Sequence, residues 1–281
     1  MKIGVVGLGL IGASLGWELK NKGHTIIGIS RRQSTCDQAL ATEIVSFASL
    51  DLADLKGCKV VILATPIAAV IPTLKNAIPY LDAYCLVTDV ASVKEQIVTE
   101  ASQLWPQFIG GHPMAGTARK GIEAAQLDLF KNAVYVLTPT DETNPKDQQI
   151  LSQLLTPLGV QLLTCSPAEH DLAVAWISHL PVITSTALIQ SSVQENNDTI
   201  RQLAELLASS GFRDTSRVGG GNPELGRMMA EYNRKALLTS LQGYRQQLDQ
   251  LIVLITEQKW PELETQLTRN AEGRKQFVPE S

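Results

Sequence analysis

Short apolar runs alternate with amphipathic stretches over the first 165 residues of the chain. Several of the runs are continuously apolar, as expected for strands that a parallel sheet buries on both faces. The stretch LIGASLGWELKNKG, between the first two runs, has apolar residues at helical spacing and Gly23 placed as a C-cap. The runs expected to form strands are residues 2–7, 25–30, 59–65, 84–90, 106–111, 133–139 and 160–165. This repeated strand–helix–strand pattern predicts a doubly wound α/β domain over residues 1–165.

The pattern changes after residue 165, and residues 166–281 are expected to form an all-helical second domain. A helix over 168–194 is almost wholly apolar, and Pro181 within it removes an amide donor and should kink it. Such an apolar helix in a small domain favours a homodimer core, although large monomers also bury such helices. The other expected helices are residues 199–209, 223–257 and 260–270, with a polar, glycine-rich link over 210–225.

Composition excludes several classes of protein. The net charge is −4 and no block of lysine and arginine stands out, which argues against a nucleic-acid surface. The apolar N-terminus contains glycines and lacks a cleavage site, so it reads as a strand and not as a signal peptide. No run reaches 18 uninterrupted apolar residues, so no transmembrane helix or membrane partner is expected. Four scattered cysteines favour a reduced, cytoplasmic protein, and the spacing of the four histidines gives no reason to expect a metal site.

A glycine-rich segment between the first strand and the first helix predicts a dinucleotide site. The sequence GLGLIG matches GxGxxG, with Gly7 and Gly9 for the turn and close approach of a ligand, and Gly12 for packing of helix on strand. A pyrophosphate would then lie on the helix N-terminus at Leu10 and Ile11, where free amides favour an anion.

The end of the second strand indicates which cofactor binds. An NAD site usually has an acidic residue there, whereas this chain has Ser30, Arg31 and Arg32. A hydroxyl and guanidinium groups bind a 2′-phosphate that a carboxylate would repel, so NADP is predicted over NAD. The alternative is a solvated arginine pair. Thr65 and Pro66, after the strand at 59–65, either line the nicotinamide ribose or form an ordinary strand-to-helix turn.

His112 lies in IGGHPMAGT, directly after the strand expected over 106–111, where glycine and proline predict a turn. An imidazole at the ligand-binding end of the sheet is suited to accept a hydroxyl proton during hydride transfer. A histidine that only forms hydrogen bonds in the loop is the alternative. Ser92, close to Lys94, would hydrogen-bond His112 or the substrate, or form a capping box with Glu95 at the start of the next helix.

The helical part contributes further candidates. His179 lies just before Pro181 and is either a satisfied core histidine or, at a kink that faces the crevice, a substrate contact. The link over 210–225 holds Arg213, Asp214 and Arg217. The guanidinium fork fits a carboxylate, while pairing between arginine and aspartate within the loop is the alternative.

Five segments in this order, GLGLIGASL, DVASVK, GGHPMAGT, HDLAVAWISHLP and GFRDTSR, make the chain resemble the prephenate/arogenate dehydrogenase family of tyrosine biosynthesis. The resemblance covers almost the whole chain and, with SRR after the second strand, is strongest to the NADP-dependent arogenate dehydrogenases. It implies that His112 accepts the ring hydroxyl proton while hydride passes to NADP and the ring carboxylate leaves as carbon dioxide. It also implies that Ser92 holds His112 and the hydroxyl in register, and that Arg217 binds the ring carboxylate. The other implied substrate contacts are His179, Asp214 (at the pocket mouth, across a dimer interface) and Thr117.

The chain departs from prephenate-using relatives at three positions, Val182, Ala118 and Gly226, which the resemblance places beside the substrate side chain. Arogenate is favoured as substrate by analogy with the NADP-dependent relatives, and prephenate is the alternative. Two other functions remain open. One is another enzyme of similar plan, a β-hydroxyacid dehydrogenase or pyrroline-carboxylate-type reductase, and the other is an NADP-binding regulator without catalytic activity.

Overall fold

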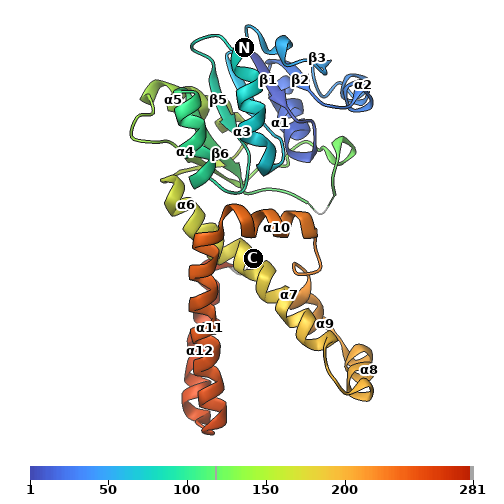
Figure 1. Ribbon diagram of the computed structural model, residues 1–281, viewed down its shortest axis with the longest axis vertical. Helices are drawn as coiled ribbons and strands as arrows, with labels where there is room; N and C mark the ends of the chain where they lie inside the picture. The colour runs from blue at the N-terminus through green and yellow to red at the C-terminus, as the bar shows by residue number, and fades with distance from the viewer. Residues whose placement is uncertain (118, 279–281) are drawn as a thin grey trace. The chain divides into compact units, whose positions relative to one another are not determined.

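The computed structural model describes residues 1–117 and 119–278, and the first part of the chain is a sheet with helices on both faces (Figure 1). In the described residues eight strands form one sheet in the order β3-β2-β1-β4-β5-β6-β7-β8. The strands are β1 Lys2–Val6, β2 Thr25–Ile29, β3 Phe47–Ser49, β4 Val60–Leu63, β5 Leu86–Asp89, β6 Phe108–Pro113, β7 Val134–Thr138 and β8 Gln161–Thr164. The order of β1 to β6 is that of a Rossmann fold, which confirms the predicted fold class. Only β3 was not anticipated, because three residues are too few to carry a periodic signal.

Alternate residues of the strands face two separate hydrophobic cores. Ile3 and Val5 of β1 pack in one cluster with side chains of α1 and α5, while Val61 and Leu63 of β4 pack in the other with side chains of α3 and α4. Each such fully buried aliphatic side chain contributes about 1.5–3 kcal/mol relative to exposure. The helices of this part are α1 Leu10–Asn21, α2 Gln33–Ala41, α3 Ile67–Ala77, α4 Glu95–Leu104 and α5 Pro145–Leu155, with 3₁₀ turns η1 Leu52–Leu55, η2 Ile78–Tyr80, η3 Ile122–Ala124 and η4 Thr156–Leu158.

The sheet is not wholly parallel, which corrects the expectation from the apolar runs. Strand β6 pairs antiparallel with β7, and β7 then pairs parallel with β8. Both arrangements bury a strand on two faces, so hydrophobicity alone does not distinguish them.

Strand β6 changes its partner partway along its length. Phe108 and Ile109 pair with β5, whereas Gly110 to Pro113 pair with β7. His112 pairs with Val136, so it belongs to the strand and does not lie in a turn after it. The glycines and the proline suggested a turn, but ladder pairing with β7 keeps this segment extended.

The second part of the described chain is helical, as predicted for residues beyond 166. Its elements are α6 Pro167–Val174, the π-helical turn η5 Ala175–His179, α7 Leu180–Val193, α8 Asp198–Leu207, α9 Ser210–Ser216, α10 Pro223–Tyr232, α11 Arg234–Thr256 and α12 Trp260–Phe277. Two details differ from the prediction. The polar link over 210–225 contains α9, and the helix expected over 223–257 is interrupted at Asn233, which ends α10 with φ −118° and ψ 35°.

The apolar helix around Pro181 changes its hydrogen-bond register at the proline. Five π-helical residues, η5, directly precede α7, and Pro181 stands in the first turn of α7, where its missing N–H is tolerated. By length and composition alone, Pro167–Val193 is apolar enough to cross a membrane, since an 18-residue window within it has a mean hydropathy of 1.7 and is 28% buried. A core helix of a water-soluble protein passes the same test, so the expectation of no transmembrane helix stays a prediction.

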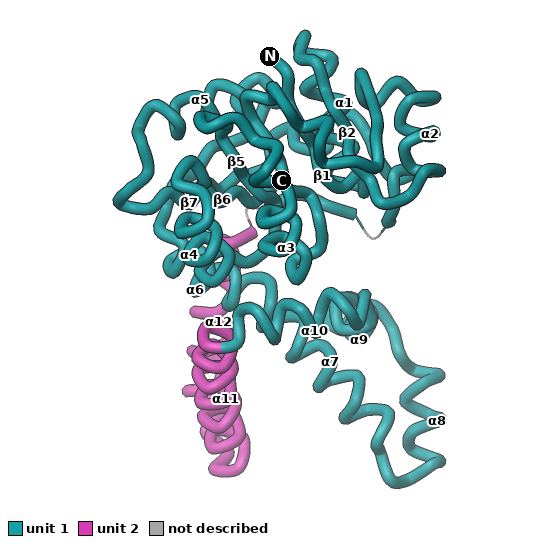
Figure 2. Tube along the Cα trace, turned by 45° about the horizontal axis from the view of Figure 1, so that its top comes forward, with its two compact units in different colours: residues 1–234 teal, residues 235–281 magenta. Residues whose placement is uncertain are grey.

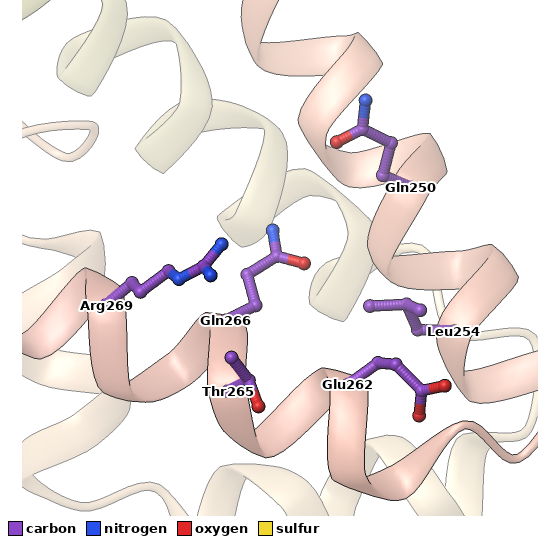
Figure 3. A pocket seen from close by; sticks show the side chains of 6 residues that line it. All are labelled: Gln250, Leu254, Glu262, Thr265, Gln266 and Arg269. Carbon is purple, nitrogen blue, oxygen red and sulfur yellow. The ribbon is translucent and has the colours of Figure 1, made fainter.

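The chain divides into two compact units, residues 1–234 and 235–281 (Figure 2). The second unit consists of α11 from Lys235 onward and α12, which lie side by side. A groove of about 500 Å³ runs between these two helices (Figure 3). It is lined by Gln250, Leu254, Glu262, Thr265, Gln266 and Arg269, and none of the histidines lies in it.

Candidate active site

The turn between β1 and α1 has the close packing that its glycines predict. Gly7 has φ +101°, and its N–H donates to the carbonyl oxygen of Ile29 at 2.8 Å. A Cβ on Gly12 would overlap the Gly7 carbonyl oxygen and lie 2.7 Å from the Ala64 Cβ. A Cβ on Gly9 would meet nothing within 4 Å. Gly7 and Gly12 therefore have structural reasons to be glycine, whereas Gly9 leaves open space above the turn.

The N-terminus of α1 is open to an anionic ligand. Gly9 is its N-cap, no side chain caps it, and its first turn, which includes Leu10 and Ile11, contains no acidic residue. Thr65 follows β4 next to Gly7, and its buried Oγ1 has no hydrogen-bond partner among the described residues. Pro66 is the N-cap of α3. Free helix amides and an unpartnered hydroxyl beside them fit a dinucleotide whose pyrophosphate lies on this turn.

Ser30, Arg31 and Arg32 lie between β2 and α2. The Ser30 hydroxyl accepts a hydrogen bond from the Arg32 N–H at 3.3 Å, and both arginines are exposed. No carboxylate occupies the end of β2. The segment therefore offers a hydroxyl and two guanidinium groups to an anion bound beside the β1–α1 turn.

A buried ion pair holds β6 where it leaves β5. The Lys94 ammonium pairs with the Asp89 carboxylate, and both side chains are fully buried. Lys94 Nζ also donates to the Gly111 carbonyl oxygen at 2.7 Å, while the Gly111 N–H donates to Asp89 Oδ1 at 3.1 Å. Burial lowers the pKa of Lys94, and the neighbouring Asp89 opposes that shift. At Gly111, one residue before His112, the ion pair thus supplies the hydrogen bonds that β5 supplies earlier along β6.

The two glycines before His112 are required by this packing. A Cβ on Gly110 would lie 2.6 Å from Val98 Cγ2, and one on Gly111 would lie 2.7 Å from the Asp89 carbonyl oxygen. Any larger residue would push β6 away from the ion pair. The GGH sequence therefore reflects close approach, not a turn with positive φ.

His112 is the first member of a chain of three hydrogen-bonded side chains. Its Nδ1 lies 2.8 Å from His170 Nε2, and His170 Nδ1 lies 2.8 Å from Asp171 Oδ1. The Asp171 carboxylate also accepts hydrogen bonds from the N–H groups of Lys94 and Glu95, at 2.7 and 2.8 Å. His170 and Asp171 are 2% and 1% exposed, so these two side chains are shielded from water, whereas His112 is partly buried.

These contacts fix the tautomers. In a neutral His170, the acceptor-only carboxylate requires the proton on Nδ1, which leaves Nε2 as an acceptor. His112 must then donate from Nδ1, and its Nε2 carries a free lone pair. The arrangement presents a base at the end of the chain.

The capping box expected at Ser92 and Glu95 is absent. Helix α4 begins at Glu95, its N-cap is Lys94, and no side chain within the segment caps it. The Asp171 carboxylate takes the amides that Ser92 would have capped. The same S-x-x-E pattern does form a capping box at Ser166 and Glu169, which starts α6. Ser92 is partly buried and stands three residues beyond Asp89.

His179 belongs to the same cluster from the other side. Its Nδ1 lies 3.1 Å from Asn233 Nδ2, and its buried Nε2 has no partner among the described residues. Asn233 Nδ2 also donates to the Asp171 carbonyl oxygen at 2.8 Å. His179 is therefore not a fully satisfied core histidine.

Both candidate site histidines are held neutral. Burial lowers the pKa of His112 well below its usual value, and the positive charge of Lys94 adds to this effect. Burial likewise lowers the pKa of His179 to about 4, although Asp171 opposes the shift. An imidazole that stays unprotonated near neutral pH is available as a base.

The remaining candidates of the helical part are exposed. Arg213 and Asp214 pair with each other at 3.0 Å on the surface, as the alternative interpretation expected. Arg217 ends α9, which α7 holds through a hydrogen bond from Ser185 Oγ to the Thr215 carbonyl oxygen. Arg217 is exposed and has no ion pair within the described ranges.

The loop after β6 and the start of α7 carry the other positions singled out in the sequence. Thr117 is exposed, and its hydroxyl accepts from the Arg119 N–H at 3.2 Å. Ala118 lies outside the described residues. Val182 and Gly226 do come together, since a Cβ on Gly226 would lie 3.7 Å from Val182 Cγ1. The contact joins α10 to the turn of α7 that follows His179.

Sequence reasoning missed the residues that organise the histidines. His170, Asp171 and Asn233 received no role, and Asp89 was not considered. One signal was present: an adjacent histidine and aspartate near the start of an otherwise apolar helix must find partners when buried. Asn233 gave no comparable signal, because it seemed to lie within one continuous helix.

The two glycine substitutions Gly12→Ala and Gly9→Ala are expected to separate folding from ligand binding. Gly12→Ala should lower the free energy of unfolding by about 1–3 kcal/mol through overpacking. Gly9→Ala should change it by less than about 0.5 kcal/mol but weaken dinucleotide binding at least about tenfold, because its methyl group enters the space of the ligand. Urea unfolding and a fluorescence titration with the dinucleotide measure the two effects. Normal binding by Gly9→Ala would contradict this placement of the pyrophosphate.

The free energy of unfolding is expected to fall as the pH drops from about 6.5 to 4. Unfolded His179 takes up a proton near its usual pKa of 6.5, whereas folded His179 does so only near 4. The unfolded state therefore binds more protons in this window, which costs about 3 kcal/mol by pH 4. Urea unfolding of the wild type and of His179→Gln at several pH values measures the difference. An equally steep pH dependence in both proteins would be inconsistent with the low pKa.

Comparisons with known proteins match both parts of the chain to one family. Residues 15–164 match the model of the prephenate dehydrogenase nucleotide-binding domain, and residues 166–269 match that of the prephenate dehydrogenase dimerization domain. Prephenate dehydrogenase of Bacillus subtilis is 31% identical over 261 residues, covering 90% of this chain and 70% of the relative.

Two solved structures extend the likeness to the whole chain. The crystal structure of Synechocystis arogenate dehydrogenase is 58% identical, with a TM-score of 0.93 over 99% of this chain and 100% of that one. Prephenate dehydrogenase from A. aeolicus, in complex with hydroxyphenyl propionate and NAD⁺, is 24% identical, has a TM-score of 0.93 and shares the fold over 99% of this chain and 98% of that one. The chain, a dehydrogenase with a nucleotide-binding domain, belongs to the prephenate/arogenate dehydrogenase family.

Proposed function

We propose that this protein is an NADP-dependent arogenate dehydrogenase, which converts L-arogenate to L-tyrosine with release of carbon dioxide. The observation that carries the proposal is the base at the end of the hydrogen-bonded Asp171–His170–His112 series, on a strand parallel to the one that leads into the dinucleotide turn. The substrate assignment is supported by the 58% identity to Synechocystis arogenate dehydrogenase.

His112 is the base in this mechanism. Its Nε2 lone pair accepts the proton of the ring hydroxyl, and the positive charge that forms is spread toward Asp171 through His170. Because burial and Lys94 hold the pKa of free His112 low, the imidazole is unprotonated before the substrate binds. Lys94 and Asp89 keep the ring in place by fixing Gly111.

The dinucleotide, when bound, supplies the acceptor for hydride from the carbon that bears the hydroxyl group. Loss of the ring carboxylate as carbon dioxide returns the electrons of that bond to the ring, which becomes aromatic. The proton held on His112 then passes back to the phenolic oxygen, so no proton is consumed or released overall. The cofactor would be held by the β1–α1 turn and the end of β4, at Gly7, Gly9, Leu10, Ile11, Gly12, Thr65 and Pro66.

The substrate contacts are proposed from the resemblance of the motifs. Ser92 orients the hydroxyl toward His112, and Arg217 binds the ring carboxylate with its guanidinium fork. His179 offers a polar group at the substrate or nicotinamide. Thr117 and Asp214, whose side chains are both exposed, are proposed as contacts at the outer part of the substrate site.

Substrate selection is proposed to depend on Val182 and Gly226. These two small residues approach each other between α7 and α10, so neither presents a large polar or aromatic group there. Prephenate is the second candidate substrate, because the Bacillus subtilis relative at 31% identity is a prephenate dehydrogenase. The two substrates differ only in the side chain, which is an amino acid in arogenate and a keto acid in prephenate.

NADP is proposed over NAD because Ser30, Arg31 and Arg32 stand where an acidic residue would select NAD. The exposed guanidinium groups suit a 2′-phosphate. NAD remains the alternative, since the A. aeolicus relative was crystallised with NAD⁺.

A homodimer through the helical part is proposed from its exposed apolar side chains and from the matched dimerization domain. Exposed apolar side chains on helices are typical of subunit interfaces. Apolar side chains of this part that are 51–84% exposed include Val193, Leu206, Leu207, Ile252, Trp260, Leu267 and Phe277. Sedimentation equilibrium should give twice the mass of the chain at micromolar concentration, and a single-chain mass would contradict the dimer.

The first test is the initial rate of NADPH or NADH formation with L-arogenate or prephenate. Fast turnover with arogenate and NADP only is the expected result. Turnover with prephenate only would replace the proposed substrate, and equal catalytic efficiency with NADP and NAD would contradict the cofactor preference. No turnover with any pair would contradict the enzymatic proposal itself.

His112→Ala should lower kcat at least about a hundredfold, because no group remains to accept the hydroxyl proton. His24→Ala is the matched control, since among the described residues the His24 ring hydrogen-bonds only the N-terminal amine. Near-normal turnover of His112→Ala would favour another reaction scheme of the Rossmann dehydrogenases.

A further inference from the structure

The two histidines of the site have opposite hydrogen-bonding surroundings. His112 Nδ1 faces a nitrogen acceptor, His170 Nε2, whereas His179 Nδ1 faces an amide nitrogen, Asn233 Nδ2. His179 is 1% exposed, and among the described residues its Nε2 has no partner. A buried polar atom left free beside a base indicates a contact with a ligand.

The orientation of the Asn233 amide follows from its second contact. Nδ2 lies 2.8 Å from the carbonyl oxygen of Asp171. If the amide were turned over, its oxygen would face that carbonyl oxygen, and two acceptors would repel each other. Nδ2 therefore donates one hydrogen to Asp171 and the other to His179 Nδ1. Asn233 is 5% exposed, so water does not compete for these hydrogens.

We propose that Asn233 is a positioning residue that forces His179 into the tautomer with its proton on Nε2. The inference rests on the proposed function, because it assigns a partner to this donor within the same site. His179 Nε2–H donates to an oxygen acceptor of the bound ligand, either a carboxylate of the substrate or the carboxamide oxygen of the nicotinamide. Asn233 touches neither ligand and acts through His179.

Asp171 connects the two tautomers. Its carboxylate makes His112 Nε2 an acceptor through His170, and its main-chain carbonyl makes His179 Nε2 a donor through Asn233. The site thus offers one acceptor for a hydroxyl proton and one donor for an oxygen. The titratable groups around His179 are Asp171, His170 and His112. Burial keeps His179 neutral near neutral pH, so its donor does not depend on protonation.

The tautomers are measured directly by ¹⁵N NMR of imidazole-labelled protein without ligand. The chain has four histidines, and each signal is assigned from the corresponding His→Gln variant. The expected spectrum has Nδ1 unprotonated and Nε2 protonated in His179, with the reverse in His112. A protonated Nδ1 in His179 would overturn the proposal, whatever the enzyme turns over.

Asn233→Asp tests the consequence for function, because a carboxylate accepts where the amide donates. Neutral His179 must then carry its proton on Nδ1, so its Nε2 would repel an oxygen acceptor. Protonated His179 still donates from Nε2, so the variant should bind normally at low pH. Above the raised pKa of His179 the KM of the affected ligand should increase about tenfold to a hundredfold, with a smaller change in kcat. A KM that stays flat with pH would contradict the proposal.

Asn222→Asp is the matched control. Asn222 caps the N-terminus of the helix that Asn233 ends, and its side-chain oxygen accepts from the Glu224 N–H, which a carboxylate does equally well. This variant should keep the wild-type KM at every pH. If Asn233→Asp does not fold, the wild-type spectrum still decides the tautomer.

Adding L-arogenate alone or NADP alone to the labelled protein shows which of the two ligands supplies the oxygen that accepts from His179 Nε2–H. A shift of His179 Nε2 with arogenate only assigns the substrate, and a shift with NADP only assigns the nicotinamide. No shift with either would overturn the ligand contact. The expected tautomers without turnover on arogenate or prephenate would instead reject the proposed function and leave the role of Asn233 intact.

Discussion

The buried Asp89–Lys94 ion pair is the interaction on which the rest of the site depends. Its two side chains hydrogen-bond the N–H and the carbonyl oxygen of Gly111, where β6 no longer pairs with β5. They bind backbone groups that a neighbouring strand would otherwise bind. Removing one partner of such a pair usually costs about 3–5 kcal/mol, because a charge stays buried without compensation. Lys94 also contributes its main-chain amide to Asp171. Lys94 therefore fixes both the strand that carries His112 and helix α6, which carries His170 and Asp171.

From this anchor a single aspartate organises both histidines. Asp171 receives two amides at the start of α4, directs its carboxylate to His170 and offers its carbonyl oxygen to Asn233. The contacts with His170 and Asn233 determine which ring nitrogen of each site histidine carries the proton. The imidazoles of His112 and His179 stay neutral until a hydroxyl proton arrives, and burial favours that resting state. Catalytic geometry and proton placement thus follow from the same few hydrogen bonds.

Much of the fold was predictable because its signals are local. Seven strands followed from apolar runs, the β1–α1 turn from its glycines, and the helical second part from the absence of strand patterns. The failures were also physical. An antiparallel β7 has the same hydrophobicity as a parallel one, and pairing with β7 kept His112 extended in spite of its glycines and proline. At Ser92 a distant carboxylate took the place of the local cap.

The class of fold, the dinucleotide turn and the histidine at the end of the sheet could be predicted from the sequence, since each depends on residues close together in the chain. Tertiary structure decided how that histidine works. His112, His170 and Asn233 are 58 and 63 residues apart along the chain, and only packing of the helical part against the sheet brings them to Asp171. Hydrogen bonds between such distant residues leave no spacing in the sequence, because any loop of sufficient length permits them.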